Sequence, residues 1–462
     1  MAHVARYHDS AAHNPRRTST SDGIDAASEL LSILFCGIEN APNVSLADGS
    51  MLYGGSSPRA SLILSDLSVL RDILIAASDV RAGEAFVRGD IRVDGDLESA
   101  IGSLEDARAV RSARELSRIV QLAIGLKGSA QSPNVKAARE PARLRGRLHS
   151  RARDRAAVEY HYNVSNEFYA LWLDSDMTYS CAYFRSPSDT LDVAQQSKFD
   201  LIARKLRLAQ GDRFLDIGCG WGGLIRFAAR EYGARAVGIT LSSRQAEYAR
   251  SRIRDEGLAN VCSVELVDYR DLSQLGSFDK IASVGMVEHV GAASLREYFN
   301  AAYRGLADGG LFLNHGIVSQ APEPTGLRRL VEHAIGSGLR GFVGRYVFPD
   351  GDLLRLDRAA SAAANAGFET LDIENLRPHY ATTLRHWVRR LENNEARARA
   401  LVGDATYNTW RLYMAGSARG FAVGRMGVVQ MLLAKRDARG AIKAPATRDD
   451  IYAMSASARQ IG

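Results

Sequence analysis

The chain has 462 residues, of which 46% are hydrophobic and 24% are charged, and its formal net charge at pH 7 is +6. This length allows two or three domains, and the composition excludes a collagen-like, proline-rich or wholly disordered protein. The longest uncharged apolar run, at residues 30–38, is about half the ~18–20 residues that a transmembrane helix needs.

The first 22 residues are polar, which argues against a signal peptide, and we expect them to form a disordered lead-in. Four cysteines, Cys36, Cys181, Cys219 and Cys262, lack both the paired spacing of a zinc site and the density of a disulfide scaffold. We therefore expect reduced thiols, no metal site and a cytoplasmic location.

Residues 23–125 combine helical patterns with short alternating runs, and they predict a small N-terminal α+β domain. Residues 126–155 are poor in apolar side chains and contain two prolines, so we interpret them as a linker. Nine Lys/Arg residues stand against two acids between Lys127 and Arg155. Such a stretch favours an anionic surface, either nucleic acid or phospholipid headgroups, or else it is only a solvated linker.

Residues 156–440 alternate strand and helix patterns, with strands expected near 213–217, 235–240, 263–267, 280–285 and 311–315. This alternation predicts an α/β domain with a doubly wound, mostly parallel sheet of the Rossmann-like kind. After about residue 350 the chain reads mainly as helices that cap the sheet. Residues 441–462 are expected to form a polar tail.

A glycine loop, LDIGCGWGG at 215–223, lies between an expected strand and an expected helix. It contains G-x-G-x-x-G at Gly218, Gly220 and Gly223, which nucleotide-binding folds of several kinds use. Asp216 precedes the glycines as in the D-x-G-x-G loops of S-adenosylmethionine (SAM) methyltransferases. A nicotinamide site needs an acid about 20 residues further on, whereas the next strand ends in Thr240-Leu241-Ser242. An acid, Asp268, instead follows the third strand, so the loop predicts a SAM methyltransferase.

Several ordered segments resemble one enzyme family. They are YHYNVSNEFY (160–169), MTYSCAY (177–183), the glycine loop, GITLSSRQ (238–245), DYRDL (268–272), SVGMVEHVG (283–291), YVFPDG (346–351) and YATTL (380–384). In this order they resemble the cyclopropane-fatty-acyl-phospholipid synthases and the related mycolic acid cyclopropane synthases and methyltransferases. The resemblance covers about 155–435 strongly. It extends loosely to 40–105, which is similar to the small lipid-associated domain of the phospholipid enzymes.

The resemblance implies that a SAM methyl group is transferred to the double bond of an unsaturated phospholipid acyl chain. The resulting carbocation then loses a proton, in the family to a bound bicarbonate, and closes a cyclopropane ring. The residues implied for the anion and the base are Glu288, His315 and Tyr380, with the backbone at Cys181 and Ile317. A carbocation needs nearby negative charge and a dry pocket, which is consistent with this set.

For SAM the resemblance implies Tyr179 and Ser180 near the methionine end and Asp216, Gly218, Gly220, Gly222 and Gly223 in the loop beneath it. Thr240, Leu241 and Gln245 would lie by the ribose, and Tyr269 and Arg270 at the adenine. Three structural alternatives stay open. Glu288 could cap a helix, His315 could be a hydrogen-bonded core histidine, and Tyr380 could simply pack near Pro378.

The segment YMAGSARGF (413–421) resembles a family segment that usually carries a cysteine, where this chain has Ser417. No covalent step needs a thiol here, so activity is compatible with the change. The product is left open between a cyclopropane and a methylene- or methyl-branched chain.

A catalytically silent SAM- and lipid-binding protein is the remote alternative from another class. A nucleic-acid methyltransferase is disfavoured because no RNA-binding module accompanies the basic stretch. The expected partners are membrane phospholipid with unsaturated acyl chains and an anionic membrane surface, with no nucleic acid and a possible homodimer. The expected location is the cytoplasm, with peripheral association at the inner face of the membrane.

Overall fold

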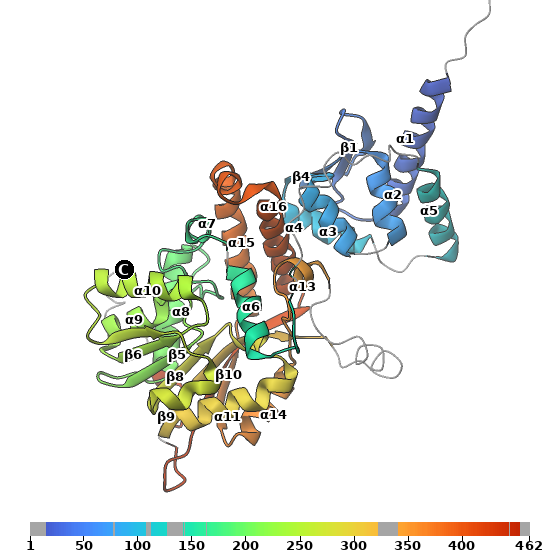
Figure 1. Cartoon of the computed structure of the whole chain (residues 1–462). Helices are drawn as coiled ribbons and strands as arrows, with labels where there is room; N and C mark the ends of the chain where they lie inside the picture. Colours follow the sequence, from blue (N-terminus) through green and yellow to red (C-terminus); the bar gives the residue numbers. More distant parts are fainter. Residues whose placement is uncertain are drawn as a thin grey trace, which may run out of the picture. The chain divides into compact units, whose positions relative to one another are not determined.

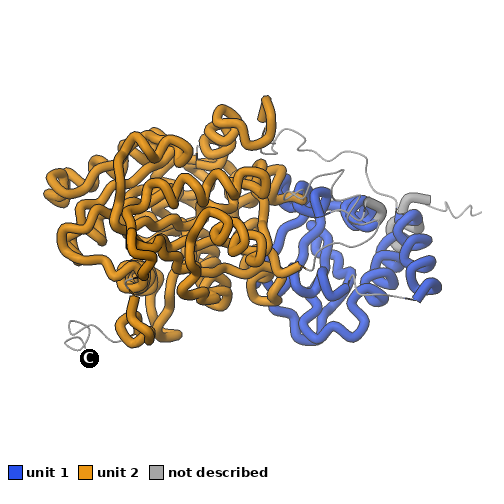
Figure 2. The backbone as a smooth tube through the Cα atoms, turned by 90° about the horizontal axis from the view of Figure 1, so that it is seen from below, with its two compact units in different colours: residues 1–138 blue, residues 139–462 orange. Residues whose placement is uncertain are grey.

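The computed structural model describes residues 15–76, 79–107, 112–126, 142, 144–162, 164–321, 341–442 and 444–452. The chain divides into two compact units, residues 1–138 and 139–462 (Figure 2). In the described ranges, no helix is both long and apolar enough to cross a membrane.

The first unit contains a four-stranded sheet with the strand order β2-β1-β3-β4. β1 and β3 are parallel, and the other two pairs are antiparallel. The strands are β1 (Asn43–Leu46), β2 (Met51–Tyr53), β3 (Ala60–Leu64) and β4 (Ile91–Gly95). The helices are α1 (Pro15–Leu34), α2 (Leu67–Ala76), α3 (Asp79–Arg88), α4 (Leu97–Asp106) and α5 (Ala113–Gly125). The alternating burial of β3 reflects the apolar-polar alternation of its sequence, since successive side chains face opposite sides of a sheet.

One expectation for this unit needs correction, because α1 already begins at Pro15, inside the expected lead-in 1–22. A proline is well tolerated in the first turn of a helix, where its missing N–H is not needed. Tertiary contact also supports α1. Glu29 on α1 forms a bidentate ion pair with Arg118 on α5, with an Nη2–Oε2 distance of 2.6 Å. Residues 1–14 lie outside the described residues.

The second unit is built on a seven-stranded sheet with the order β10-β11-β9-β8-β5-β6-β7 (Figure 1). From β9 to β7 all neighbours are parallel, whereas β11 is antiparallel to both β9 and β10. The strands are β5 (Arg213–Ile217), β6 (Arg235–Ile239), β7 (Cys262–Glu265), β8 (Phe278–Val284), β9 (Leu306–Ser319), β10 (Glu369–Asn375) and β11 (Met426–Ala434).

Helices cover both faces of this sheet, and each face has its own apolar core. One core packs α8 (Leu191–Lys205), α9 (Gly223–Tyr232) and α10 (Ser243–Asp255) against the sheet. The other packs the 3-10 helix η1 (Tyr269–Leu275), α11 (Leu295–Gly305) and α14 (Leu356–Asn365) against the opposite face. The predicted α/β class with a doubly wound, mostly parallel sheet is confirmed.

The C-terminal part contains two long helices, α15 (Arg377–Asn393) and α16 (Glu395–Ala422), as well as β10 and β11. The two strands were not predicted. β11 reads as one apolar run, MGVVQMLLA, because it lies inside the sheet between β9 and β10, and such a run does not distinguish a buried strand from a buried helix. The expected polar tail contains a short helix, α17 (Asp449–Tyr452), whose Ile451 is buried.

Shorter elements complete the second unit. They are α6 (Arg151–Tyr162), α7 (Asn166–Ala170), α13 (Phe342–Tyr346) and the 3-10 helices η2 (Val287–His289) and η3 (Ala292–Ser294). α6 begins at Arg151, so the last five residues of the expected linker 126–155 are helical.

Candidate active site

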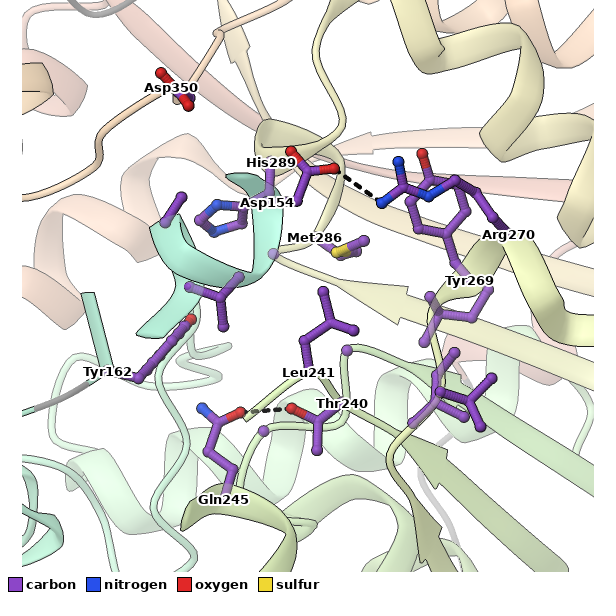
Figure 3. A pocket seen from close by; sticks show the side chains of 18 of the residues that line it. Asp154, Tyr162, Thr240, Leu241, Gln245, Tyr269, Arg270, Met286, His289 and Asp350 are labelled. Carbon is purple, nitrogen blue, oxygen red and sulfur yellow. Dashed lines mark hydrogen bonds and ion pairs between the residues drawn. The ribbon is translucent and has the colours of Figure 1, made fainter. Parts of the chain in front are cut away.

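A cavity lies at the carboxyl ends of the parallel strands, where ligands bind in open α/β sheets. It encloses about 830 Å³ of empty space, part of it open to solvent. Its walls come from the segments after β5, β6, β7 and β8, from α6 and from residues 349–350 (Figure 3).

The glycine loop after β5 contributes Gly218 and Gly220 to the cavity wall. Both have positive φ, +79° at Gly218 and +55° at Gly220, so side chains would strain the loop where it approaches the cavity. Gly222 and Gly223, which we expected to bind SAM, do not line the cavity. Gly222 is the N-cap of α9 with φ +82°, and a Cβ there would lie 2.9 Å from Cβ of Ala249.

The predicted ribose residues Thr240, Leu241 and Gln245 all line the cavity. The Thr240 hydroxyl donates to Gln245 Oε1 at 2.8 Å, which fixes the amide at the start of α10 (Figure 3). No acid stands here at the end of β6, where a nicotinamide ribose would need one.

The predicted adenine residues Tyr269 and Arg270 also line the cavity, after β7. The Arg270 guanidinium is held by Asp268 at 2.7 Å and by Asp154 of α6 at 2.9 Å (Figure 3). It also lies 5.1 Å from the centre of the Tyr269 ring. Burial raises the pKa of the Tyr269 phenol, so this ring is neutral.

Helix α6 closes one side of the cavity with Asp154, Ala157, Val158 and Tyr162. Its first turns are tied to the surrounding walls, because Arg151 pairs with Asp271 and Arg153 pairs with Asp350 at 2.5 Å. Of these two arginines, which we counted in the basic stretch, Arg153 is tied to the cavity-lining Asp350, whereas Arg151 is 56% exposed in its ion pair. The sequence alone could not distinguish paired from free arginines in this stretch.

Three predicted cofactor residues, Tyr179, Ser180 and Asp216, do not line this cavity: Ser180 and Asp216 are buried, and Tyr179 is half-buried. The Tyr179 hydroxyl donates to the Tyr413 hydroxyl at 3.3 Å. Ser180 Oγ accepts a bond from Lys198 Nζ at 2.9 Å. Burial raises the pKa of Asp216 to about 7, and its Oδ1 has no hydrogen-bond partner within the described ranges.

Glu288 on η2 is the most unusual carboxyl group of the site. Its Oε1 accepts a hydrogen bond from the backbone N–H of Ile317 on β9 at 2.6 Å. Its Oε2 is buried and has no partner among the residues that the structure describes. Burial raises the pKa of Glu288 to about 7. The Glu288 side chain does not cap η2, because the N-cap of this helix is Met286 and no side chain bonds there.

His315 on β9 and Tyr380 on α15 are both buried. Gln430 Nε2 lies 3.2 Å from His315 Nδ1, and with the amide assigned this way Nδ1 accepts and Nε2 carries the proton. Burial lowers the pKa of His315 to about 3, so the ring is neutral. Burial raises the pKa of Tyr380, and Tyr413, Cys181 and Glu288 add to the shift, which indicates that these groups lie near one another.

Of the two backbone groups that the resemblance implied, at Cys181 and Ile317, the fold already uses one. The N–H of Ile317 is occupied by Glu288. The Cys181 thiol is buried, lies 3.8 Å from the carbonyl oxygen of Leu376, and has a raised pKa because of its burial.

Within the described residues, no group of three His, Cys, Asp or Glu side chains is placed to hold a metal ion.

A cluster of aromatic rings beside these groups was not anticipated. We call it the aromatic cluster, with neighbouring ring centres 4.1–6.4 Å apart: His161, Tyr162, Tyr169, Trp172, Tyr179, Trp221, Phe348, Trp387, Trp410 and Tyr413. Burial raises the pKa of Tyr162 and of Tyr413, and the Glu288 charge adds to both shifts. The feature of the sequence that hints at this cluster is the density of aromatic residues in 160–184.

Residues 149–431 match the family described as mycolic acid cyclopropane synthetase. A probable fatty acid methyltransferase of Pseudomonas putida is 42% identical over 407 residues, which cover 88% of this chain and 95% of that protein. Cyclopropane mycolic acid synthase 1 of Mycobacterium tuberculosis is 33% identical over 280 residues, 61% of this chain and 97% of that protein.

Two solved structures resemble the second unit. The cyclopropane synthase MmaA2 from Mycobacterium tuberculosis is 32% identical with a TM-score of 0.55, and the match covers 61% of this chain and 98% of that one. A mycolic acid cyclopropane synthase complexed with SAH and CTAB is 33% identical with a TM-score of 0.56, at the same coverage.

Proposed function

Because the chain belongs to the mycolic acid cyclopropane synthetase family, we propose that it adds a one-carbon unit to the double bond of an unsaturated phospholipid acyl chain and forms a cyclopropane ring. As a member of this family, the chain is a SAM-dependent methyltransferase. The observation that supports cyclopropane formation is the Glu288 carboxyl group, which is buried beside the aromatic cluster with one oxygen unpartnered among the described residues.

The chemistry requires what these residues can provide. The π electrons of the alkene attack the methyl carbon of SAM, and the sulfonium leaves with the electron pair of the broken C–S bond. The chain is then a carbocation, which must lose one methyl proton to close the ring. Aromatic faces attract a cation, and a site lined by buried rings excludes the water that would otherwise quench it.

Bicarbonate fits the polar groups at this place. When bound, it would supply the base that takes the proton. Glu288 Oε2 is free among the described residues to accept the bicarbonate hydroxyl proton, and the Nε2–H of His315 and the Tyr380 hydroxyl are suitable donors to its oxygens. The N–H of Ile317 would orient Glu288 and would not contact the anion.

A methylene- or methyl-branched acyl chain is the second candidate product. The residue that supports this candidate is Ser417. The Ser417 hydroxyl forms a hydrogen bond with Tyr413, and the charge of Glu288 raises the pKa of the same tyrosine. A change at this position can therefore alter which proton the carbocation loses. A catalytically silent lipid-binding protein is disfavoured because Glu288, His315 and Tyr380 are all present.

The lipid substrate requires docking on a membrane, and we propose peripheral association through the basic stretch. In its described part, Arg145 and Arg147 are exposed, and the neighbouring Leu148 is 56% exposed. Two cations beside an apolar side chain suit an anionic lipid interface.

The decisive experiment is to express the chain in cells that lack such an enzyme and to analyse their phospholipid acyl chains by mass spectrometry and NMR. We expect a mass increase of one CH₂ with ring-proton signals, and none in a Glu288→Gln control. Vinylic methylene or branched methyl signals would replace the cyclopropane proposal with the second candidate. Unmodified lipids together with normal SAM binding would contradict both.

A further inference from the structure

Lys198 on α8 has no part in the chemistry described above, yet it is 1% exposed. A buried ammonium group is costly unless charges or hydrogen bonds compensate it. Burial lowers the pKa of Lys198 to about 8. The groups that face it from three segments raise this pKa and so oppose the effect of burial; they are Asp174, Asp176, Cys181 and Asp216. A lysine retained under these conditions is a candidate for a binding role.

The contact between Lys198 and Ser180 has a directional consequence. Lys198 Nζ lies 2.9 Å from Ser180 Oγ. An ammonium group can only donate, so Ser180 Oγ accepts this bond and its own hydroxyl proton must point to another acceptor. Lys198 therefore makes Ser180 a hydrogen-bond donor.

The same face of α8 fixes the segment that carries Ser180. Gln195 Nε2 donates to the Ser180 carbonyl oxygen at 2.9 Å and to that of Thr178 at 3.3 Å. Asp174 accepts from the N–H of Thr178 at 2.7 Å. The Ser180 hydroxyl is thus positioned by both backbone and side-chain contacts.

Ser180 lies directly behind the cavity wall at Gly285. A Cβ built on Gly285, which lines the cavity after β8, would lie 4.0 Å from Cβ of Ser180. The transferable methyl group must face Glu288 and His315, which lie after β8 and on β9. The amino-acid end of SAM then belongs at β5 and β8, beside Ser180, and the adenosine belongs at β6 and β7.

We propose that Lys198 is a positioning residue for SAM, which holds the Ser180 hydroxyl as a donor to the carboxylate of the methionine moiety and supplies the positive charge facing it. Among the acids that face it, Asp174 accepts hydrogen bonds from the N–H and the hydroxyl of Thr178 at 2.7 and 3.0 Å, and burial raises the pKa of both Asp174 and Asp216. The proposal rests on SAM use but not on the lipid substrate.

Calorimetry with SAM and with decarboxylated SAM tests this proposal without any lipid. The two probes differ by the carboxylate alone. We expect the wild-type protein to bind SAM at least about tenfold more tightly, as a charge-assisted hydrogen bond provides. Lys198→Met and Ser180→Ala should each reduce that preference to nearly onefold.

A matched control is Lys205→Met, which removes the other buried lysine of α8, paired with Asp372 and Glu374. It should lower stability yet keep the preference for SAM, because it does not touch Ser180. In the wild type the preference should also decline as pH rises through about 8, where Lys198 loses its proton. In Lys198→Met the only pH dependence left should be that of the SAM α-amino group, which titrates in the same range, so the difference between the two profiles measures the contribution of Lys198.

An unchanged preference in a folded Lys198→Met protein would overturn the proposal. If that variant does not fold, an unchanged preference in Ser180→Ala overturns it equally. The lipid experiment can fail while Lys198→Met and Ser180→Ala still lose the preference for SAM over decarboxylated SAM. That result would reject the proposed lipid product and support the binding role of Lys198.

Discussion

The carboxylate of Glu288 accepts a hydrogen bond from the backbone N–H of Ile317 at 2.6 Å. This bond joins the short helix η2 to β9 and fixes the orientation of the carboxyl group. One oxygen is occupied by the fold, and the other is left for a ligand or a proton. A residue that the sequence alone could interpret as a helix cap therefore has the geometry of a proton acceptor.

Replacement of Glu288 by Gln tests that role. The amide oxygen can still accept from Ile317, so we expect normal SAM binding and a turnover reduced by roughly 10²–10³-fold, as when one preorganised polar group is removed. Glu297→Gln on the exposed side of α11 is the control. If Glu288→Gln turns over unsaturated lipid vesicles within threefold of the wild-type rate, Glu288 has only a structural role.

The raised pKa of Glu288 also predicts a pH dependence of stability. Burial raises the pKa of this carboxyl from 4.5 to about 7 in the folded state. Between these values the folded protein binds more protons than the unfolded chain, so the free energy of unfolding should fall as pH rises from about 4.5 to 7. Urea unfolding at several pH values measures this, and Glu288→Gln should show a smaller fall. An equal fall in the variant would assign the effect to other groups, such as Asp216.

The cofactor specificity follows from Leu241, which stands where a nicotinamide site needs a ribose-binding acid. We expect calorimetry to detect binding of SAM and S-adenosylhomocysteine and none of NAD. Binding of NAD with comparable affinity would contradict the assignment of the cavity.

Membrane docking is expected to depend on Arg145 and Arg147, since Arg151 and Arg153 are engaged in ion pairs and Arg143 lies outside the described residues. Their joint replacement by Gln should weaken co-sedimentation with anionic liposomes, most clearly at low salt, because such attraction is screened within about 8–10 Å at physiological ionic strength. Replacement of Arg296 and Arg304, both exposed on α11, is the matched control. Equal sedimentation of the two double variants would assign docking to another surface.

A stability prediction concerns Arg226 on α9, which is 1% exposed and pairs with Asp176 at 2.8 Å and with Glu256. Arg226→Ala leaves both carboxylates without this partner and should lower the free energy of unfolding by about 2–4 kcal/mol. Arg230→Ala, one turn later on the same helix and 43% exposed, should cost less than about 1 kcal/mol. Urea denaturation compares the two, and similar losses would refute a special role for the buried pair.

The glycine loop and the strands around it could be predicted because their signal is local: an apolar strand, glycines at the turn and a helix follow one another within 20 residues. The aromatic cluster could not, since His161, Phe348 and Trp410 meet only through the tertiary fold. The same limit applies to Arg151, whose charge is visible in the sequence although its partner Asp271 is 120 residues away.

The position of β11 has a consequence for synthesis of the protein. This strand is among the last structured parts of the chain, yet it lies between β9 and β10 and presents Gln430 to His315. A nascent chain on the ribosome therefore exposes the apolar edge of β9 and lacks the partner that sets the His315 tautomer until residues 426–434 have emerged. The enzyme can become active only after translation of this unit is nearly finished, and until then its unpaired sheet edge is a natural client for chaperones.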